Sequence, residues 1–326
     1  MRHCAVLVLY LLCAAPLQHA AAQSPGGYPN RPIRMIAPSS PGGPVDVLAR
    51  ILAQGMTGTL GQQIVVENRA GAAGQIGAEL VAKSAPDGYT LLLGFSGPLA
   101  ISPNINEKTP YDSLRDFVPV SQVAAAPYVL LVHPTVPVKS VKELVALARS
   151  RPGKMNFASG GNGTGLHMAG ELLNFTASIK IVHVPYKGAG PGIIAMMGGE
   201  VDMMFNGVAA ALPHIKSGKV RALAVGGDKR SPLVPELPTI AESGLKFNTT
   251  GWYGVVAPRG TPQSVVARLH AETVKALSLP AMKEQLANLG VDSVGSTPDQ
   301  FATLIREEFA TWAKVIKAAG LKGMPM

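Results

Sequence analysis

The residues of this chain that could do chemistry stand in short glycine-rich loops that also contain hydroxyl side chains. The first loop, residues 38–43, places Ser39, Gly42 and Gly43 between an apolar run and a helical pattern. Glycine has no Cβ, so an anion can approach its backbone N–H closely, and a helix that follows adds its positive N-terminal end. An ordinary turn explains this loop equally well by itself, but the recurrence of the pattern favours anion binding.

A longer loop at residues 159–165 repeats the pattern. It resembles a dinucleotide loop, but Leu166 stands where the G-x-G-x-x-G spacing requires its last glycine. An anion held by backbone N–H groups and by the hydroxyls of Ser159 and Thr164 fits the residues better. One hydrogen bond to a charged carboxylate contributes about 1.5–3 kcal/mol, so several such donors could hold a dicarboxylate without any arginine.

Three further residues have simple interpretations. Asn206 follows a short apolar run, so we expect it at the carboxyl end of a strand, where it could contact a ligand. Asp46 and Arg50 are four residues apart in a helical pattern, which predicts a surface ion pair that contributes at most about 0.5 kcal/mol.

Enzyme motifs are weak in this sequence. The stretch around Ser96 lacks the final glycine of a G-x-S-x-G elbow, and neither Ser96 nor Ser159 has a histidine and an acid at a recognisable spacing. The histidines lack H-x-H and H-E-x-x-H spacing, and His133 and His167 are interpreted as turn and helix-start residues. The sequence therefore predicts a binding protein without a metal or cofactor. A hydrolase that uses Ser96 or Ser159 is the enzymatic alternative.

Apolar runs that alternate with helical patterns position these loops. Residues 33–37, 64–67 and 90–93 are predicted strands, each followed by a loop and a helical pattern, and the same order restarts at residue 155. Such alternation predicts α/β architecture with parallel, doubly wound sheets. Ligands of these sheets bind at the carboxyl ends of the strands, where the loops described above fall.

Two stretches are predicted to cross between lobes. The first consists of two strand-like runs, 117–123 and 128–132, joined by residues 124–127, and the second is the strand 252–257. The chain then ends in two helices, for which Thr261 and Thr297 are predicted N-caps.

The two crossings make a two-strand hinge. It divides the chain into a first lobe of residues 28–124 plus 250–326 and a second lobe of residues 125–249. The last helix has one apolar face, which we expect to pack on the first lobe.

The N-terminal segment differs from the rest of the chain. Residues 1–22 join a short basic start to an apolar stretch and a run of alanines, which predicts a signal peptide cleaved before Gln23. A lipoprotein anchor is not expected, because Leu12 precedes Cys13 where lipoprotein processing needs a small residue. Both cysteines lie inside this segment, so we expect a mature, exported, soluble chain without disulfides.

The formal net charge is +9 at pH 7, and the basic residues are dispersed along the chain. Nucleic-acid binding would require a clustered basic patch, so no nucleic-acid partner is expected. A mild positive excess could steer an anionic small ligand toward the protein, or it could simply favour solubility.

Several motifs occur in order along nearly the whole predicted mature chain. Among them are Pro41-Gly42-Gly43, Val66-Glu67-Asn68-Arg69, Ala85-Pro86-Asp87-Gly88-Tyr89, Pro185-Tyr186-Lys187-Gly188, Gly199-Glu200-Val201-Asp202 and Ala257-Pro258-Arg259-Gly260. In this order they resemble the Bug-type receptors, the periplasmic solute-binding proteins of tripartite tricarboxylate transporters.

The resemblance implies a type II periplasmic-binding-protein fold whose two lobes close on a small carboxylate, either a di- or tricarboxylate or an aromatic acid. The implied partners are integral-membrane transporter subunits. It also implies a periplasmic location, and we expect a monomer. Family members bind ligand through backbone groups and ordered water. Carried over residue by residue, the implied ligand-binding positions are Ser39, Gly42, Gly43, Ala73, Gly74, Ser96, Gly97, Ser159, Thr164 and Asn206.

Two departures from the family pattern bear on the ligand. Pro44-Val45 stands where family loops commonly have glycine and threonine, and Asn206 stands where the family often has an aspartate. The missing aspartate argues against a ligand with an amino group. A receptor that senses the ligand for a signalling system, instead of delivering it to a transporter, is the alternative among binding proteins.

Overall fold

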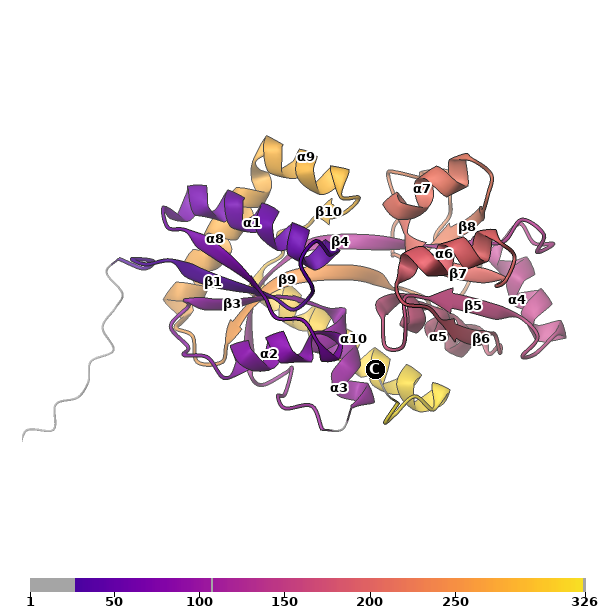
Figure 1. Cartoon of the computed structure of the whole chain (residues 1–326), viewed down its shortest axis with the longest axis horizontal. Coiled ribbons are helices and arrows are strands. Elements are labelled where there is room, and N and C mark those ends of the chain that lie inside the picture. The colour runs from indigo at the N-terminus through magenta and orange to yellow at the C-terminus, as the bar shows by residue number, and fades with distance from the viewer. Residues whose placement is uncertain (1–26, 107, 325–326) are drawn as a thin grey trace, which may run out of the picture.

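The computed structural model describes residues 27–106 and 108–324 (Figure 1). The predicted signal peptide, with both cysteines, lies outside the described residues. Within the described residues, no helix is long and apolar enough to cross a membrane.

Three parallel strands begin the first sheet. β1 (Ile33–Ala37) pairs on one side with β2 (Ile64–Asn68) and on the other with β3 (Thr90–Phe95). The interior of β3 is buried throughout, as expected for a strand covered on both faces. All three carboxyl ends therefore lie at one edge of the sheet.

Helical segments follow each of these strands. α1 (Pro44–Leu60) follows β1, and Ala72–Gly74 with α2 (Gln75–Ala82) follows β2. After β3 come Gly97–Ile101 and α3 (Ser102–Ile105). The predicted order is confirmed, with boundaries that differ by one or two residues.

The second sheet repeats this arrangement. β5 (Asn156–Ser159) pairs in parallel with β6 (Val182–Pro185) and with β7 (Met203–Gly207), whereas β8 (Arg221–Val225) pairs antiparallel with β4 (Phe117–Val132).

Four helices belong to this part of the chain. They are α4 (Val141–Ser150), α5 (Gly165–Ala177), α6 (Ala189–Met197) and α7 (Val208–Lys216). The Ser140 side chain caps α4 by accepting a hydrogen bond from the Glu143 N–H. A short 3₁₀ turn, Ala241–Ser243, lies in the segment that returns to the first sheet.

β4 and β9 (Thr250–Pro258) run antiparallel beside one another and connect the two sheets (Figure 1). β4 is one strand of 16 residues, so the prediction of two runs joined by residues 124–127 was wrong. Pro127 is paired with Thr250 in the β4–β9 ladder. The register shifts at two other places in β4, between Pro119 and Ser121 and between Gln122 and Ala124, and such bulges let a strand bend.

The chain ends with α8 (Gln263–Ser278), α9 (Pro280–Asn288), β10 (Asp292–Ser293) and α10 (Pro298–Ala319). The predicted Thr297 cap is confirmed as a capping box with Gln300. The predicted Thr261 cap was wrong, because the Thr261 hydroxyl donates to the Pro258 carbonyl and Pro262 precedes the helix.

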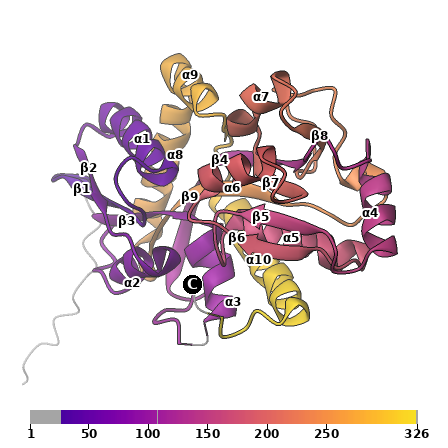
Figure 2. The same cartoon turned by 45° about the vertical axis from the view of Figure 1, so that its right-hand side comes forward.

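α10 packs against both parts of the molecule, and not against the first lobe alone as predicted. Phe301 and Ile305 join the core around β1 and β3, whereas Trp312 and Ile316 join the core around β5 and α5. The apolar face is long enough for both contacts because the helix has 22 residues. Figures 1 and 2 show α10 running beneath the connecting strands.

Candidate functional site

The three loops that follow β1, β2 and β3 converge. A Cβ added at Gly74 would lie 3.2 Å from Pro98 Cγ, 3.3 Å from the Pro38 carbonyl oxygen and 3.4 Å from Phe95. Gly74 also has a φ of +95°, which favours glycine. The predicted positions from Ser39 to Gly97 therefore gather at one edge of the first sheet.

The loops that follow β5 and β6 converge in the same way. A Cβ at Gly160 would lie 3.3 Å from the Ala189 nitrogen, and the Gly188 N–H donates to the Gly160 carbonyl at 3.2 Å. Asn206 stands near the end of β7, as predicted, and is 4% exposed.

Figures 1 and 2 place both sets of loops on the sides of the two lobes that face one another. We call them the interlobe loops: residues 38–43, 71–75, 96–98, 159–164, 186–188 and 206–207. Helices α1, α2, α5, α6 and α7 all begin at these loops. Their N-terminal ends concentrate partial positive charge and backbone N–H groups, an environment that favours an anion.

Asp46 fixes the first interlobe loop. Its carboxylate accepts hydrogen bonds from the Gly42 N–H at 2.8 Å, from Asn68 Nδ2 at 2.9 Å and from Arg50 Nε at 3.2 Å. Asn68 Nδ2 also donates to the Ser39 carbonyl, which ties the loop to the end of β2.

The predicted ion pair is confirmed, because Arg50 Nη2 lies 2.9 Å from Asp46 Oδ1. Its predicted surface position was wrong for Asp46, which is only 3% exposed. Burial by itself raises the pKa of Asp46, but the hydrogen bonds from Arg50, Gly42 and Asn68 outweigh burial and hold that pKa below its ordinary value. The Gly42 N–H is therefore already engaged within the protein.

The loop after β2 is strained. Ala72 and Ala73 have φ angles of +46° and +52°, and Gly74 continues the left-handed run. A non-glycine residue in this region costs about 1–2 kcal/mol. Such strain concentrates at binding sites, and successive backbone N–H groups in a turn of this kind form a concave surface for anions.

Ser159 is paired with a histidine that sequence spacing did not indicate. Its Oγ lies 2.6 Å from His183 Nε2, accepts a hydrogen bond from the Gly161 N–H at 3.0 Å and lies 3.1 Å from the Gly161 carbonyl. Ser159 has no exposed surface. The hydroxyl therefore anchors the turn of the 159–164 loop.

The surroundings of His183 weaken it as a base. Its ring stacks on that of His167 with 3.7 Å between ring centroids, and Phe157 packs against both rings. Burial, followed by the effect of His167, lowers the pKa of His183 to about 3. The ring is therefore neutral near pH 7, and the buried Ser159 offers no surface to a substrate in this structure.

The other predicted polar side chains divide into engaged and available groups. The Thr164 hydroxyl accepts from the His167 N–H and donates to the Gly161 carbonyl at 2.8 Å, and Asn206 Oδ1 accepts from the Gly207 N–H. Within the described residues, Ser96 Oγ and Asn206 Nδ2 have no hydrogen-bond partner in the protein. Ser39 Oγ makes only a long contact of 3.4 Å to the Ser40 carbonyl.

Sequence reasoning missed His183 and Asn68 at this site. Asn68 is the last residue of β2, and His183 lies on β6 beside Ser159 on β5. The position of Asn68 at a strand end was a usable signal, but pairing between β5 and β6 could not be read from residue spacing.

Comparison with known proteins identifies the family. A family model described as the tripartite tricarboxylate transporter family receptor matches residues 48–321. This chain belongs to that family. The chain is also similar to Protein BugT of Bordetella pertussis (strain Tohama I), with 42% identity over 305 residues, which cover 93% of this chain and 94% of BugT. The resemblance seen in the motifs is confirmed.

Two similar solved structures contain a carboxylate. A protein from R. palustris with adipate is 34% identical, has a TM-score of 0.76 and covers 90% of this chain and 99% of its own. MatC from Rhodopseudomonas palustris with bound malate is also 34% identical, with a TM-score of 0.73 and coverage of 89% and 100%. Solved periplasmic binding proteins of this family confirm the predicted two-lobed fold.

Proposed function

We propose that this protein is a periplasmic receptor that captures a small carboxylate, a di- or tricarboxylate or an aromatic acid, between its two lobes and delivers it to integral-membrane transporter subunits. The proposal treats the protein as a monomeric binding protein without catalytic activity, exported by a cleavable signal peptide. The two lobes of the proposal are the predicted ones, residues 28–124 plus 250–326 and residues 125–249.

The observation that carries the proposal is the kind of polar atom left available at the interlobe loops. Ser39 and Ser96 offer hydroxyls, Asn206 offers an amide NH₂, and the left-handed turn at Ala73 offers backbone N–H groups. These groups can all donate hydrogen bonds, and helix N-termini surround them. A carboxylate accepts such bonds without an arginine, in keeping with the adipate and malate in the similar structures.

The side chain of Asn206 restricts the ligand class. Asn206 brings no negative charge, so the ammonium group of an amino acid would lack a counter-charge at this position. Mono-, di- or tricarboxylates without an amino group suit the loops better. Micromolar binding of glutamate or aspartate in calorimetry would contradict this restriction.

Thermal unfolding of the chain without residues 1–22 tests the proposal. The panel consists of adipate, malate, citrate, benzoate, glutamate and a neutral diamide. A ligand at about 100 times its dissociation constant stabilises the protein by about 2.7 kcal/mol, which shifts the melting temperature by several degrees.

We expect shifts with the carboxylates that lack an amino group and none with glutamate or the neutral diamide, and we expect smaller shifts in Ser96→Ala. The matched control is Ser150→Ala, because Ser150 is an exposed serine on α4, remote from the interlobe loops. No shift with any acid, together with one for the neutral diamide, would contradict carboxylate binding. Capture of a signalling protein in place of transporter subunits from a membrane extract would favour the sensing alternative.

A further inference from the structure

Two tyrosines on the connecting strands have hydroxyl groups that the protein leaves without a hydrogen bond. Tyr128 lies on β4 and Tyr253 lies on β9. Within residues 27–106 and 108–324, neither hydroxyl has a hydrogen-bond partner. The hydroxyls of the other tyrosines in this part of the chain all donate to a protein oxygen, and these are Tyr28, Tyr89, Tyr111 and Tyr186. A tyrosine hydroxyl removed from water usually has a partner, so two unpaired hydroxyls on neighbouring strands point to a ligand.

The hydroxyl of Tyr128 lies beside the 159–164 loop. Gly165 follows this loop and begins α5, and a Cβ added there would lie 3.3 Å from Tyr128 Cζ and still closer to its Oη. A Cβ added at Gly251 of β9 would lie 2.8 Å from the same oxygen. A side chain at either position would displace the phenol, so the two glycines leave room for it. The hydroxyl is therefore held next to the N-terminal end of α5.

Tyr253 lies at the loops of the first lobe. It is paired with Phe95 in the antiparallel β3–β9 ladder, and directly paired residues have their side chains on the same face of a sheet. Phe95 is the last residue of β3, and its ring lies against Gly74 and Gly97 of two interlobe loops. Tyr253 is therefore level with the end of β3, where the 96–98 loop begins.

Both phenols remain hydrogen-bond donors near pH 7. Burial raises the pKa of Tyr253, and burial, followed by the nearby Tyr253 and Glu308, raises the pKa of Tyr128. Glu308 does not engage the Tyr128 hydroxyl, because its Oε2 accepts from the indole N–H groups of Trp252 and Trp312, at 2.8 and 3.1 Å. Each phenol thus keeps its proton and has no acceptor for it in the protein.

Both tyrosines are also accessible. Each is only partly buried, whereas Ser159 on the neighbouring strand β5 has no exposed surface. In the predicted division of the chain, Tyr128 belongs to the second lobe and Tyr253 to the first. β4 and β9 run side by side between the lobes, so the two tyrosines flank the same part of the hinge (Figure 1).

We propose that Tyr128 and Tyr253 contact the ligand directly, and that each donates its hydroxyl hydrogen to the bound carboxylate. The ligand is then held from both lobes beside the strands that connect them. This inference rests on the proposed function, because it assigns further contacts at the same site. It also makes the two tyrosines specificity-determining, since a ligand without an acceptor at this position leaves both donors unpaired.

Isothermal titration calorimetry of Tyr128→Phe and Tyr253→Phe with adipate and malate tests the proposal. Each substitution removes one oxygen and keeps the ring. We expect each to weaken binding at least about tenfold, as for the loss of a hydrogen bond to a charged group. Without ligand, neither variant should have a lower melting temperature, because these hydroxyls have no partner in the protein. A lower melting temperature without ligand, together with unchanged affinity, would assign the hydroxyls to the fold and overturn the proposal.

Tyr89→Phe is the matched control. The Tyr89 hydroxyl donates to Asn30 Oδ1 at 2.9 Å, and Tyr89 precedes β3 at the end remote from the interlobe loops. This variant should lose stability without ligand and keep the affinity of the unsubstituted protein. An equal loss of affinity in Tyr89→Phe would show that the effect of the two substitutions is not local, and would overturn the assignment.

The outcomes separate this inference from the proposed function. If the unsubstituted protein binds adipate or malate and both variants bind equally well, the tyrosine assignment is overturned and the proposed function stands. If it binds neither acid but binds the neutral diamide adipamide, the proposed function fails. The assignment then stands only if both variants weaken adipamide binding, since an amide carbonyl also accepts from a phenol. Absence of binding by all of these compounds overturns both.

Discussion

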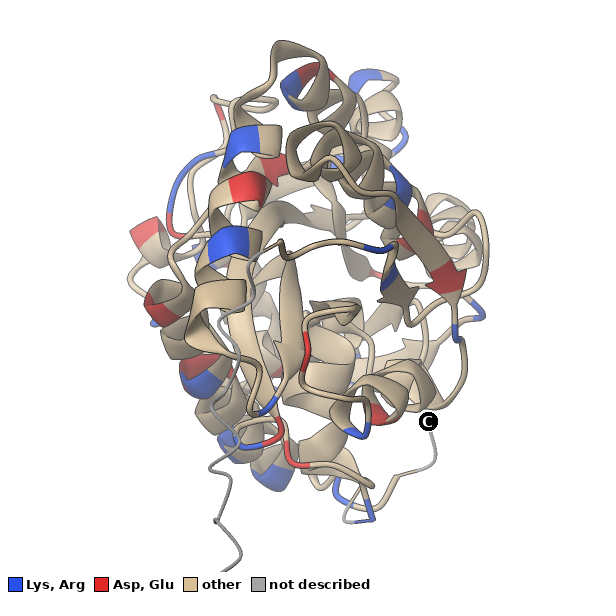
Figure 3. Ribbon diagram, turned by 90° about the vertical axis from the view of Figure 1, so that its left-hand side faces the viewer, with Lys and Arg blue, Asp and Glu red and all other residues tan. Residues whose placement is uncertain are grey.

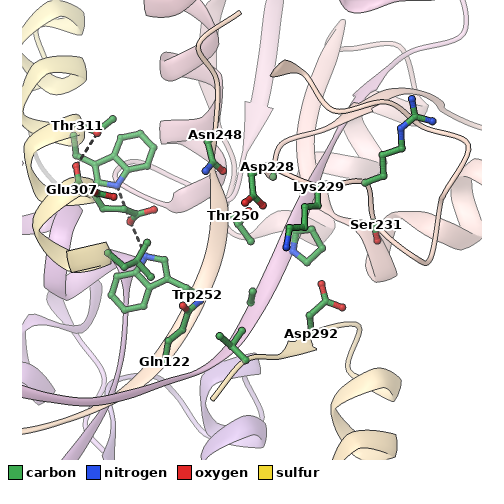
Figure 4. Close-up of a pocket in the computed structure, with 18 residues that line it drawn as sticks. Gln122, Asp228, Lys229, Ser231, Asn248, Thr250, Trp252, Asp292, Glu307 and Thr311 are labelled. Carbon is green, nitrogen blue, oxygen red and sulfur yellow. Dashed lines mark hydrogen bonds between the residues drawn. The ribbon is translucent and has the colours of Figure 1, made fainter. Parts of the chain in front are cut away.

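The interlobe loops differ in chemistry from the hinge cavity, a cavity of about 580 Å³ between β4, β9, β10, α10 and the loop after β8 (Figure 4). At the loops the available atoms are hydrogen-bond donors from Ser96, Asn206 and the backbone, gathered at helix N-termini. The hinge cavity is lined by four carboxylic acids, Asp228, Asp292, Glu307 and Glu308, and its two tryptophans are each only 2% exposed. The first environment favours an anion and the second a cation.

The comparison also shows two ways of building a site. The loops use backbone groups and short side chains whose position at strand ends is set by the α/β order of the chain. The hinge cavity uses long charged side chains from segments distant in sequence, which only the packing of α10 and β10 brings together. Charges are otherwise interspersed over the molecule, as the view in Figure 3 shows.

The largest expected effect on ligand affinity comes from replacing a hydrogen-bond donor of the interlobe loops by a negative charge. Asn206→Asp replaces a donor by a buried carboxylate, which can still accept the Gly207 N–H. We expect adipate and malate affinities to fall at least about thirtyfold, or about 2 kcal/mol, because a charged hydrogen bond becomes a repulsion. Calorimetry measures the loss. Asn288→Asp, an exposed change of equal charge, is the control, and an equal loss there would refute the assignment.

The buried carboxyl group of Glu308, which lines the hinge cavity, predicts a pH effect on the free energy of unfolding. Glu308 has its pKa raised from 4.5 to about 7, so the folded state binds an extra proton between these values. Its contribution to stability therefore falls as pH rises from about 4.5 to 7 and stays low above pH 7.

Glu308→Gln removes this dependence and keeps an acceptor for both tryptophans. We expect the variant to gain on the order of 3 kcal/mol relative to the unsubstituted protein at pH 8, and almost nothing at pH 4. Urea unfolding across this range measures the difference. The exposed Glu307→Gln should follow the unsubstituted protein, and a pH-independent difference for Glu308→Gln would contradict the account.

A smaller effect, on stability, is expected for Ser159, whose hydroxyl makes hydrogen bonds within the 159–164 loop. Ser159→Ala leaves the Gly161 N–H and a His183 nitrogen without their partner, so we expect a loss of about 1–2 kcal/mol in unfolding free energy. Ser150→Ala on α4 should lose less than about 0.5 kcal/mol. An unchanged free energy of unfolding in Ser159→Ala would mean that the contact between Ser159 and His183 does not stabilise the 159–164 loop.

The smallest effect concerns strain in the loop after β2. Ala73→Gly relieves a φ of +52° and should stabilise the protein by about 0.5–1 kcal/mol, since part of the gain is offset by unfolded-state entropy. Ala310→Gly, on an exposed turn of α10, should destabilise it by a similar amount. Denaturant unfolding distinguishes the two, and a loss in both would show that Ala73 is not strained.

Much of the architecture could be predicted from the sequence. Strands 33–37 and 90–93 were predicted because buried parallel strands are continuous apolar runs, and their order placed the loops at one edge. The Thr297 cap is local and was likewise predictable. β4 was mistaken for two runs because Pro127 is a strand breaker, yet the ladder accommodates it opposite Thr250.

Features that depend on contacts between distant segments could not be predicted. Ser159 and His183 are 24 residues apart and meet only because β5 pairs with β6. Asp46 looked like half of a surface pair, because nothing local indicates that Asn68 bonds to it and buries it. The face of α10 was recognised, but its division between two cores follows from where the connecting strands place the lobes.

Amide hydrogen exchange with and without saturating adipate or malate tests the central claim most directly. The account predicts new protection at the interlobe loops, residues 38–43, 71–75, 96–98, 159–164, 186–188 and 206–207, with little change at residues 227–231 and 292–294 of the hinge cavity. Protection confined to the hinge cavity, with the interlobe loops unchanged, would contradict the assignment of the carboxylate site.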